Sequence, residues 1–242
     1  MNLIIDIGNS YAKYAIFSQG AIILKGRILA ADLLREVDQL KGQYPKLANT
    51  MVASVGEKHH KIITYLKQEY RLIQLSEAKL PFQNQYKTPK TLGQDRIALV
   101  SAAVQRYPGH NCLIIDAGSC ITYDFVDRNK VYLGGAISPG LKLRYKALHN
   151  FTARLPLLEP QQPQELIGAS TEESIHTGVV LGIQNEIDGQ IKAYRNKYPD
   201  LTVILTGGDV EFLSNQLKSS IFAHSNFLLE GLNFILDYNS KE

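Results

Sequence analysis

Two short segments of the 242-residue chain share a pattern that suits phosphate binding. Residues 3–10 read as a buried strand that ends in Asp6, followed by a glycine and then a hydroxyl side chain, and residues 113–120 repeat this order with Asp116. Each strand would bring a carboxylate to the edge of a sheet, and the glycine lets backbone N–H groups approach an anion without a Cβ in the way. The repeat therefore predicts two similar lobes that bind a nucleotide phosphate.

The first copy forms a candidate phosphate site. A tight turn between two strands offers N–H donors and hydroxyl groups, and a lysine adds a point charge nearby; the candidate residues are Asp6, Gly8, Asn9, Ser10 and Lys13. An ordinary turn of a β-hairpin would have a similar composition, so the motif alone leaves both interpretations open.

The second copy and a later glycine pair are further candidates. A carboxylate such as Asp116 beside a phosphate site commonly binds a cation, although it could also only cap a turn. Gly207 and Gly208 follow a predicted strand and precede a helix, where close backbone approach would accommodate the adenosine part of a nucleotide. The alternative is a tight turn with Asp209 as a helix N-cap.

The segment Gly93, Gln94, Asp95, Arg96 is the candidate for the reaction itself. An Asp–Arg pair at a helix start can place a general base and an anion clamp together. The helix N-terminus and Arg96 both favour the ionised carboxylate, so Asp95 would orient a hydroxyl group and accept its proton late. Alternatively, Asp95 is an exposed carboxylate that only complements the helix dipole.

The pattern of apolar residues predicts an α/β protein with two lobes, residues 1–109 and residues 110–242. Each lobe is expected to contain a mixed sheet with flanking helices. Long loops are predicted at 76–93 and 155–168; strands at 3–6, 11–17, 21–24, 51–55, 71–75, 111–116, 120–126, 131–137 and 201–205; and helices at 30–41, 58–70, 94–107, after Pro139-Gly140, at 171–198 and near the C-terminus.

Composition is that of an ordinary globular enzyme, with 45% apolar and 20% charged residues. The net charge of +3 is small, and lysine and arginine are scattered, so nucleic acid is not an expected partner. No apolar run approaches the roughly 20 residues of a membrane span, and no signal-peptide pattern opens the chain. We therefore expect a cytoplasmic protein.

Cysteine, histidine and glycine residues give weaker signals. Cys112 and Cys120 are expected to be small buried apolar residues, and neither they nor the histidines have the spacing of a metal site. Gly178, Gly182 and Gly189 would weaken the long predicted helix, which favours close packing against another helix or another subunit.

Seven motifs together resemble the type III pantothenate kinases, members of the sugar kinase, Hsp70 and actin superfamily. They occur in the family's order and span nearly the whole chain: residues 6–10, 93–96, 116–118, 134–141, 152–156, 171–178 and 206–209. One departure is Ser119-Cys120, where the family commonly has threonine and alanine after the glycine. Serine keeps the hydroxyl group, so ATP binding is expected to survive.

The resemblance implies a duplicated, ribonuclease H-like fold and transfer of the ATP γ-phosphoryl group to the primary hydroxyl of pantothenate, the first step of coenzyme A biosynthesis. It implies Mg²⁺ with ATP, a monovalent cation (K⁺ or NH₄⁺) and a homodimer with the pantothenate site near the subunit interface. It assigns Asp6 to Lys13 and Ser119 to ATP, Asp95 to the proton acceptor and Asp116 to the monovalent cation, and it assigns Tyr86, Gly93, Gln94, Asp95, Arg96 and Thr171 to pantothenate.

Two other functions remain open at this point. A relative of these kinases could have kept the fold and become a non-catalytic regulatory protein, although the chain shows neither a basic patch nor a helix-turn-helix signal. A kinase of the same superfamily could also act on another small hydroxylated substrate, and the loop at 76–93 would then decide which one.

Overall fold

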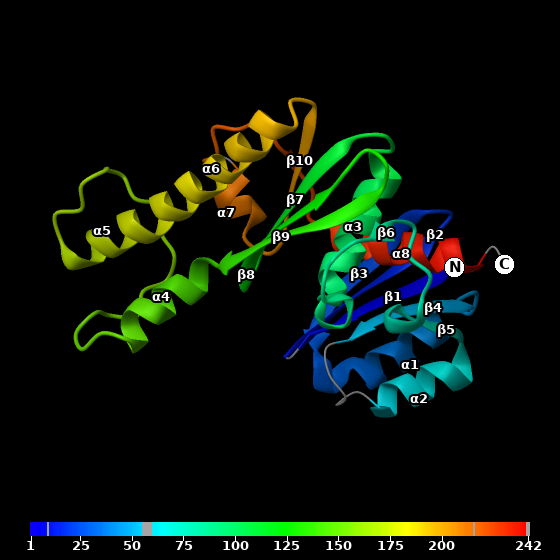
Figure 1. Cartoon of the computed structure of the whole chain (residues 1–242). Helices are drawn as coiled ribbons and strands as arrows, with labels where there is room; N and C mark the ends of the chain where they lie inside the picture. Colours follow the sequence, from blue (N-terminus) through cyan, green and yellow to red (C-terminus); the bar gives the residue numbers. More distant parts are fainter. Residues whose placement is uncertain (9, 55–59, 215, 241–242) are drawn as a thin grey trace. The chain divides into compact units, whose positions relative to one another are not determined.

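The computed structural model describes residues 1–8, 10–54, 60–214 and 216–240 (Figure 1). The predicted phosphate contact Asn9 lies outside the described residues. The chain forms two compact units, Met1–Arg106 with Asn226–Glu242 and Tyr107–Ser225. The predicted boundary after residue 109 falls close to this division. Residues 226–242, however, group with the first unit and not with the predicted second lobe.

The first unit contains a mixed sheet in the order β3-β2-β1-β4-β5. Its strands are β1 (Asn2–Ile7), β2 (Tyr11–Ser18), β3 (Ala21–Leu29), β4 (Asn49–Ser54) and β5 (Arg71–Gln74). β1 pairs antiparallel with β2 and parallel with β4, which pairs parallel with β5. This confirms the strands predicted at 3–6, 11–17, 21–24 and 71–75, and the described part of the strand predicted at 51–55.

Both faces of this sheet are covered, because residues alternate between two apolar clusters along β1. Leu3, Ile5 and Ile7 pack in the cluster that contains residues of α1 (Leu33–Gln43) and α2 (His60–Glu69). Ile4 packs in the other, with residues of α3 (Gln94–Arg106) and α8 (Phe227–Ser240). The apolar face of α8 accounts for the grouping of the C-terminal residues with the first unit.

The predicted long loop at 76–93 contains only short elements. These are a 3₁₀ turn at Leu75–Glu77, the two-residue strand β6 (Gln83–Asn84) and a 3₁₀ turn at Pro89–Thr91. The segment therefore leads from β5 to the first residue of α3 without a long regular element.

Within the second unit the strands are arranged in the order β11-β10-β7-β8-β9. Their bounds are β7 (Asn111–Ala117), β8 (Cys120–Val126), β9 (Val131–Pro139), β10 (Leu201–Thr206) and β11 (Phe222–Ala223). β7 pairs antiparallel with β8 and parallel with β10, as β1 pairs with β2 and β4 in the first unit. The duplication seen in the sequence thus extends to the pairing of the strands.

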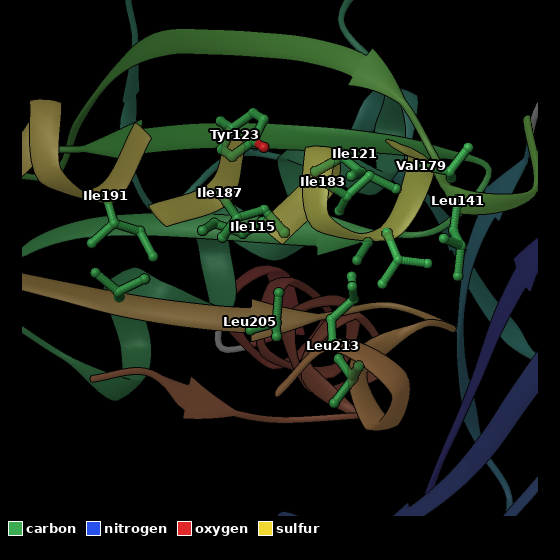
Figure 2. Packing of buried hydrophobic residues seen from close by; sticks show 14 of the residues in the cluster. Ile115, Ile121, Tyr123, Leu141, Val179, Ile183, Ile187, Ile191, Leu205 and Leu213 are labelled. Carbon is green, nitrogen blue, oxygen red and sulfur yellow. The ribbon is translucent and has the colours of Figure 1, made fainter. Parts of the chain in front are cut away.

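Helices of the second unit are α4 (Leu141–Asn150), α5 (Thr171–His176), α6 (Gly182–Lys197) and α7 (Val210–Ser214), with a π-helical turn at Thr177–Leu181 between α5 and α6. Ile183, Ile187 and Ile191 repeat at every fourth position of α6 and pack with Ile115 and Leu205 of the sheet (Figure 2). The predicted helix at 171–198 is therefore confirmed, with one π-helical turn inside it. Among the described residues, no helix is long and apolar enough to cross a bilayer.

The start of this helix differs from a standard capping box. The Glu173 N–H donates to Ser170 Oγ at 3.2 Å, as in a capping box. The Glu173 carboxylate accepts from the Ala169 N–H at 2.7 Å, not from Ser170. The reciprocal bond therefore reaches one residue further back along the chain.

Two expectations about small residues are corrected. Cys112 is buried as predicted, but Cys120 is exposed because it is the first residue of β8, directly after the turn at 118–119. The helix predicted to end at residue 41 continues through Gly42 to Gln43.

The three glycines of the long helix have open space around them. Apart from its own helix backbone and chain neighbours, a Cβ on Gly178, Gly182 or Gly189 would meet no atom of the described chain within 4 Å. Packing against another helix of this chain therefore does not explain these glycines, and packing against another subunit stays a prediction.

Candidate functional site

The predicted phosphate turn of the first unit lies at the carboxyl end of β1. Asp6 stands directly opposite Lys13 across the antiparallel pair and beside Ala53 of β4. The Gly8 N–H donates to the Tyr11 carbonyl at 2.9 Å and closes the turn. Ser10 and Lys13 are exposed, so the hydroxyl and ammonium groups are accessible to a ligand.

The first turn of α3 is held at the same edge of the sheet. Gln94 Oε1 accepts from the backbone N–H of Ser54, the last residue of β4, at 2.9 Å. Asp95 is exposed, and its Oδ1 accepts from the Arg96 N–H at 2.8 Å. A Cβ on Gly93 would lie 2.3 Å from Asp95 Oδ1, so a glycine at 93 leaves room for this orientation of the carboxylate.

Asp6 and the start of α3 lie at the same edge of the first sheet, because β1 pairs with β4 and Gln94 accepts a hydrogen bond from Ser54 of β4. Burial raises the pKa of Asp6 to about 6; the charge of Lys13 opposes this shift, and the charge of Asp95 adds to it. A second carboxylate raises a pKa in this way only when it is close. The structure thus brings the predicted phosphate turn and the predicted proton acceptor together within the first unit.

Two predicted substrate residues also meet in this unit. The Arg96 guanidinium lies over the ring of Tyr86, 5.4 Å from its centroid, and the arginine is only 5% exposed. Stacking on an aromatic ring fixes the plane of a guanidinium group. The sequence predicted both residues but gave no reason to pair them.

In the second unit, Asp116 lies near the end of β7 among other oxygen-bearing side chains. It stands opposite Thr122 of β8 and Thr206 of β10. Paired residues on neighbouring strands point to the same face, and the flanking residues Ile115 and Ala117 belong to the apolar cluster on the other face. The sequence analysis did not identify Thr122 and Thr206 as site residues. Their positions in the strands that pair with β7 could have identified them.

The loops that follow β7, β9 and β10 are joined by backbone hydrogen bonds. The Gly140 N–H donates to Ser119 O at 3.1 Å, and the Asp209 N–H donates to Ala117 O at 2.9 Å. Gly207 has φ +105°, and a Cβ there would lie 2.5 Å from Asp116 Oδ1. The predicted residues Ser119, Gly207 and Asp116 are thus brought together.

Two residues beside this junction differ in their environment. Gly208 is exposed, and a Cβ there would meet no atom of the described chain within 4 Å. Burial raises the pKa of the neighbouring Asp209, against the effect of the Lys142 charge. The structure gives Gly207 a steric reason to be glycine that Gly208 lacks.

The predicted substrate residue Thr171 is the first residue of α5 and is exposed. It lines a cavity of about 1070 Å³ in the second unit, together with Arg144, Leu148, Phe151 and Ile175 among others. This cavity was not predicted. Across the described ranges, no three His, Cys, Asp or Glu side chains are close enough to hold a metal ion.

The fold of this chain is similar to that of solved sugar kinases. A glucokinase from an Antarctic psychrotroph matches with a TM-score of 0.55 at 13% identity, over 98% of both chains. A Campylobacter jejuni protein assigned to the Baf family of transcriptional activators matches with a TM-score of 0.69 at 24% identity, over 99% of this chain and 100% of the other. Likeness at these identities shows the fold alone.

Sequence similarity identifies the family. Residues 2–193 match the family model described as type III pantothenate kinase. The type III pantothenate kinase of Christiangramia forsetii is 51% identical over 243 residues, which cover 100% of both chains. The chain therefore belongs to the type III pantothenate kinase family and is a kinase, as its motifs predicted.

The raised pKa of Asp6 predicts a dependence of stability on pH. Because the pKa in the folded state, about 6, lies above the ordinary 3.8, the folded protein binds the proton more tightly than the unfolded chain. The free energy of unfolding contributed by this group therefore falls as the pH rises from about 4 to about 6. We predict that Asp6→Asn removes this loss and raises the free energy of unfolding of the ligand-free protein by roughly 1–3 kcal/mol at neutral pH.

Urea unfolding of both proteins at about pH 4 and about pH 7, at one protein concentration, measures this effect. Lys13→Met is a control that should change stability in the opposite direction. It removes the positive charge that favours the ionised Asp6, so the free energy of unfolding at neutral pH is expected to fall. Parallel pH profiles for the wild type and Asp6→Asn would contradict the prediction.

Proposed function

We propose that this protein transfers the γ-phosphoryl group of ATP to the primary hydroxyl of pantothenate, the first step of coenzyme A biosynthesis. Membership of the type III pantothenate kinase family supports the reaction. The observation that carries the assignment is that α3, which bears Asp95 in its first turn, is tied through Gln94 to Ser54 at the end of β4, the strand that pairs with the Asp6 strand. Such a site needs to do little more than position the reactants and neutralise charge. Because the reaction consumes ATP, we propose a cytoplasmic location.

ATP is proposed to bind through both aspartate turns. In the first unit its phosphates would meet the exposed Ser10 hydroxyl and the exposed Lys13 ammonium. In the second unit Ser119 would contact the phosphates, and Gly207 and Gly208 would allow the adenosine part to approach the backbone. Mg²⁺ bound with ATP would neutralise phosphate charge, and the Asp6 carboxylate is a hard oxygen ligand suited to hold it.

Asp95 is proposed to orient the pantothenate hydroxyl and to accept its proton late in the transfer. The hydrogen bond from the Arg96 N–H fixes one of its carboxylate oxygens, so the carboxylate is held in one orientation. The Arg96 guanidinium, stacked on Tyr86, supplies a positive charge for the carboxylate of pantothenate. Gly93 and Gln94 hold the start of α3 in place.

Asp116 is proposed to bind a monovalent cation, K⁺ or NH₄⁺. Its carboxylate shares one face of the sheet with the hydroxyls of Thr122 and Thr206, which makes a donor set of oxygen atoms only. Oxygen ligands suit hard cations, and a single carboxylate matches a single positive charge.

The direct test is ATP-dependent phosphorylation of pantothenate by the purified protein, with and without K⁺ or NH₄⁺. We expect activity that depends on the cation, and Asp116→Asn is expected to remove most of this dependence because the carboxylate is lost. A coupled assay of ADP release, with mass detection of 4′-phosphopantothenate, measures both. Absence of product under every cation would refute the proposed reaction, and activity independent of cations would refute the role of Asp116.

A second test isolates Asp95. Asp95→Asn is expected to lower kcat by about 10²–10⁴ while changing ATP affinity little, since the amide keeps the shape but cannot accept the proton. Asp32→Asn is the matched control, because Asp32 lies at the start of α1 in the same unit and pairs with the exposed Arg35. Steady-state kinetics and ATP titration distinguish the variants, and near-normal kcat in Asp95→Asn would exclude the assigned role.

We further propose that the protein is a homodimer and that the second unit supplies the interface. Large apolar side chains lie exposed on this unit, with Phe151 87%, Leu166 76% and Ile167 82% exposed. Gly178 and Gly182 leave open surface on the neighbouring helical segment. A partner subunit would cover these residues and the cavity lined by Thr171, which suits a pantothenate site near the interface.

Light scattering tests the dimer directly. The wild type is expected to have twice the chain mass of 27.0 kDa. Phe151→Asp with Ile167→Asp is expected to shift the protein to monomer, since two charges would be buried without partners. Ile23→Asp in the first unit, where the isoleucine is 47% exposed, is the control that should leave the mass unchanged. A monomeric wild type would refute the proposal.

A further inference from the structure

A cluster of polar side chains joins four elements of the second unit: Tyr123 on β8, Ser138 on β9, Arg144 on α4 and Glu186 on α6. The Tyr123 hydroxyl donates to Glu186 Oε1 at 2.8 Å, and the Ser138 hydroxyl donates to Oε2 at 3.1 Å. Arg144 forms an ion pair with Glu186, and it also donates to Ser138 Oγ at 3.0 Å and to the Pro139 carbonyl at 2.9 Å.

The ion pair in this cluster is partly shielded from water. The side chains of Arg144 and Glu186 are 21% and 24% exposed. Burial tends to raise the pKa of Glu186, but hydrogen bonds from Arg144, Tyr123 and Ser138 outweigh it, and the pKa lies below its ordinary value. Glu186 therefore stays ionised at neutral pH, and its attraction to Arg144 is screened less than that of an exposed pair.

Arg144 also contacts backbone that touches the second aspartate turn. It binds the carbonyl of Pro139, which stands opposite Cys120 across the β8–β9 pair. The next residue, Gly140, donates its N–H to Ser119 O at 3.1 Å. A Cβ on Gly140 would lie 2.1 Å from Gly118 O, so the two backbone segments are in close contact.

From these contacts we propose that Arg144 and Glu186 are positioning residues for ATP, which hold the Gly118–Ser119 turn in its binding geometry through Pro139 and Gly140. α6 provides a fixed support, because its isoleucines are buried against the sheet. The side chain of Tyr123 belongs to the same buried cluster (Figure 2). The inference rests on the proposed function, since it takes the turn at Ser119 as part of the ATP site.

A purely structural ion pair would affect folding and would not affect ATP in particular. Arg128 and Asp200 form such a pair in the same unit, with side chains 55% and 53% exposed. Within the described residues, neither Arg128 nor Asp200 is hydrogen-bonded to the turn at 118–119. Arg128→Met is therefore the matched control, because it removes an arginine from an ion pair of the same unit without affecting a contact to that turn. Arg144 also lines the cavity that contains Thr171, which makes the KM for pantothenate a necessary second readout.

The experiment compares the wild type with Arg144→Met, Arg144→Lys, Glu186→Gln, the double variant Arg144→Met/Glu186→Gln and Arg128→Met. Thermal unfolding establishes that each variant folds, and steady-state kinetics give kcat and the KM for each substrate. Arg144→Met is expected to raise the KM for ATP about tenfold and to raise the KM for pantothenate by a clearly smaller factor, since Arg144 also lines the cavity that contains Thr171. The double variant is expected to bind ATP no more weakly than Arg144→Met alone, because the two residues act as one unit.

Arg144→Lys is expected to restore part of the ATP affinity, since it keeps the charge but not the forked geometry. A folded Arg144→Met with unchanged KM for ATP, or with equal increases for both substrates, would overturn the inference. Should Arg144→Met fail to fold, Tyr123→Phe removes one hydroxyl from the same cluster, and it must raise the KM for ATP about two- to threefold. Two measurements separate the positioning role from the proposed function. If the wild type does not phosphorylate pantothenate in the activity assay, the proposed function is refuted. If calorimetric titration with an unreactive ATP analogue gives equal affinity for the wild type and Arg144→Met, the positioning role is refuted.

Discussion

Parallel pairing of strands is the constraint on which the candidate sites depend. β1 runs parallel to β4, and β7 runs parallel to β10, so the segments that follow each pair begin at the same edge of their sheet. At the first edge lie Asp6 and the start of α3, which Gln94 ties to Ser54. At the second edge lie Asp116 and the turn at Gly207. In open α/β sheets, ligands bind at the carboxyl ends of the strands for this geometric reason.

The same arrangement explains why Asp6 is costly to keep ionised. β1 is covered on both faces, with Ile5 and Ile7 in one apolar cluster and Ile4 in the other, so a carboxylate near its end is partly removed from water. Lys13 on the adjacent strand offsets only part of this penalty, and the pKa stays at about 6. A cationic ligand or a bound metal ion would supply the missing positive charge. The ionised Asp6 lowers the free energy of unfolding of the ligand-free protein, and binding of a cation beside it would recover this loss.

Strands, helices and the aspartate turns could be predicted from the sequence because their signals are local. Short apolar runs identified β1 and β7, alternation identified β2, and a glycine after a strand-end carboxylate marked both turns. The stack of Arg96 on Tyr86 depends on how the segment between β5 and α3 folds back, which no periodicity encodes. The grouping of α8 with the first unit is also nonlocal, since its apolar face could have packed on either sheet. Exposure of Cys120 was missed because residue type outweighed its position beside a turn.

A phosphate turn made of glycine and serine needs support from elsewhere, because its own side chains are too small to anchor it. Gly207 and Gly140 lie so close to the turn that a Cβ on either would overlap its backbone atoms. At these positions the neighbouring segments can therefore form backbone hydrogen bonds with the turn, but no side chain can pack against it. Rigidity must then come from neighbouring elements. An arginine with several donors, paired to a carboxylate on a buried helix, can fix a backbone segment from two directions at once. In the proposed arrangement, the Arg144–Glu186 pair supports the turn through Pro139 and Gly140 and takes up none of the side chains of the turn itself.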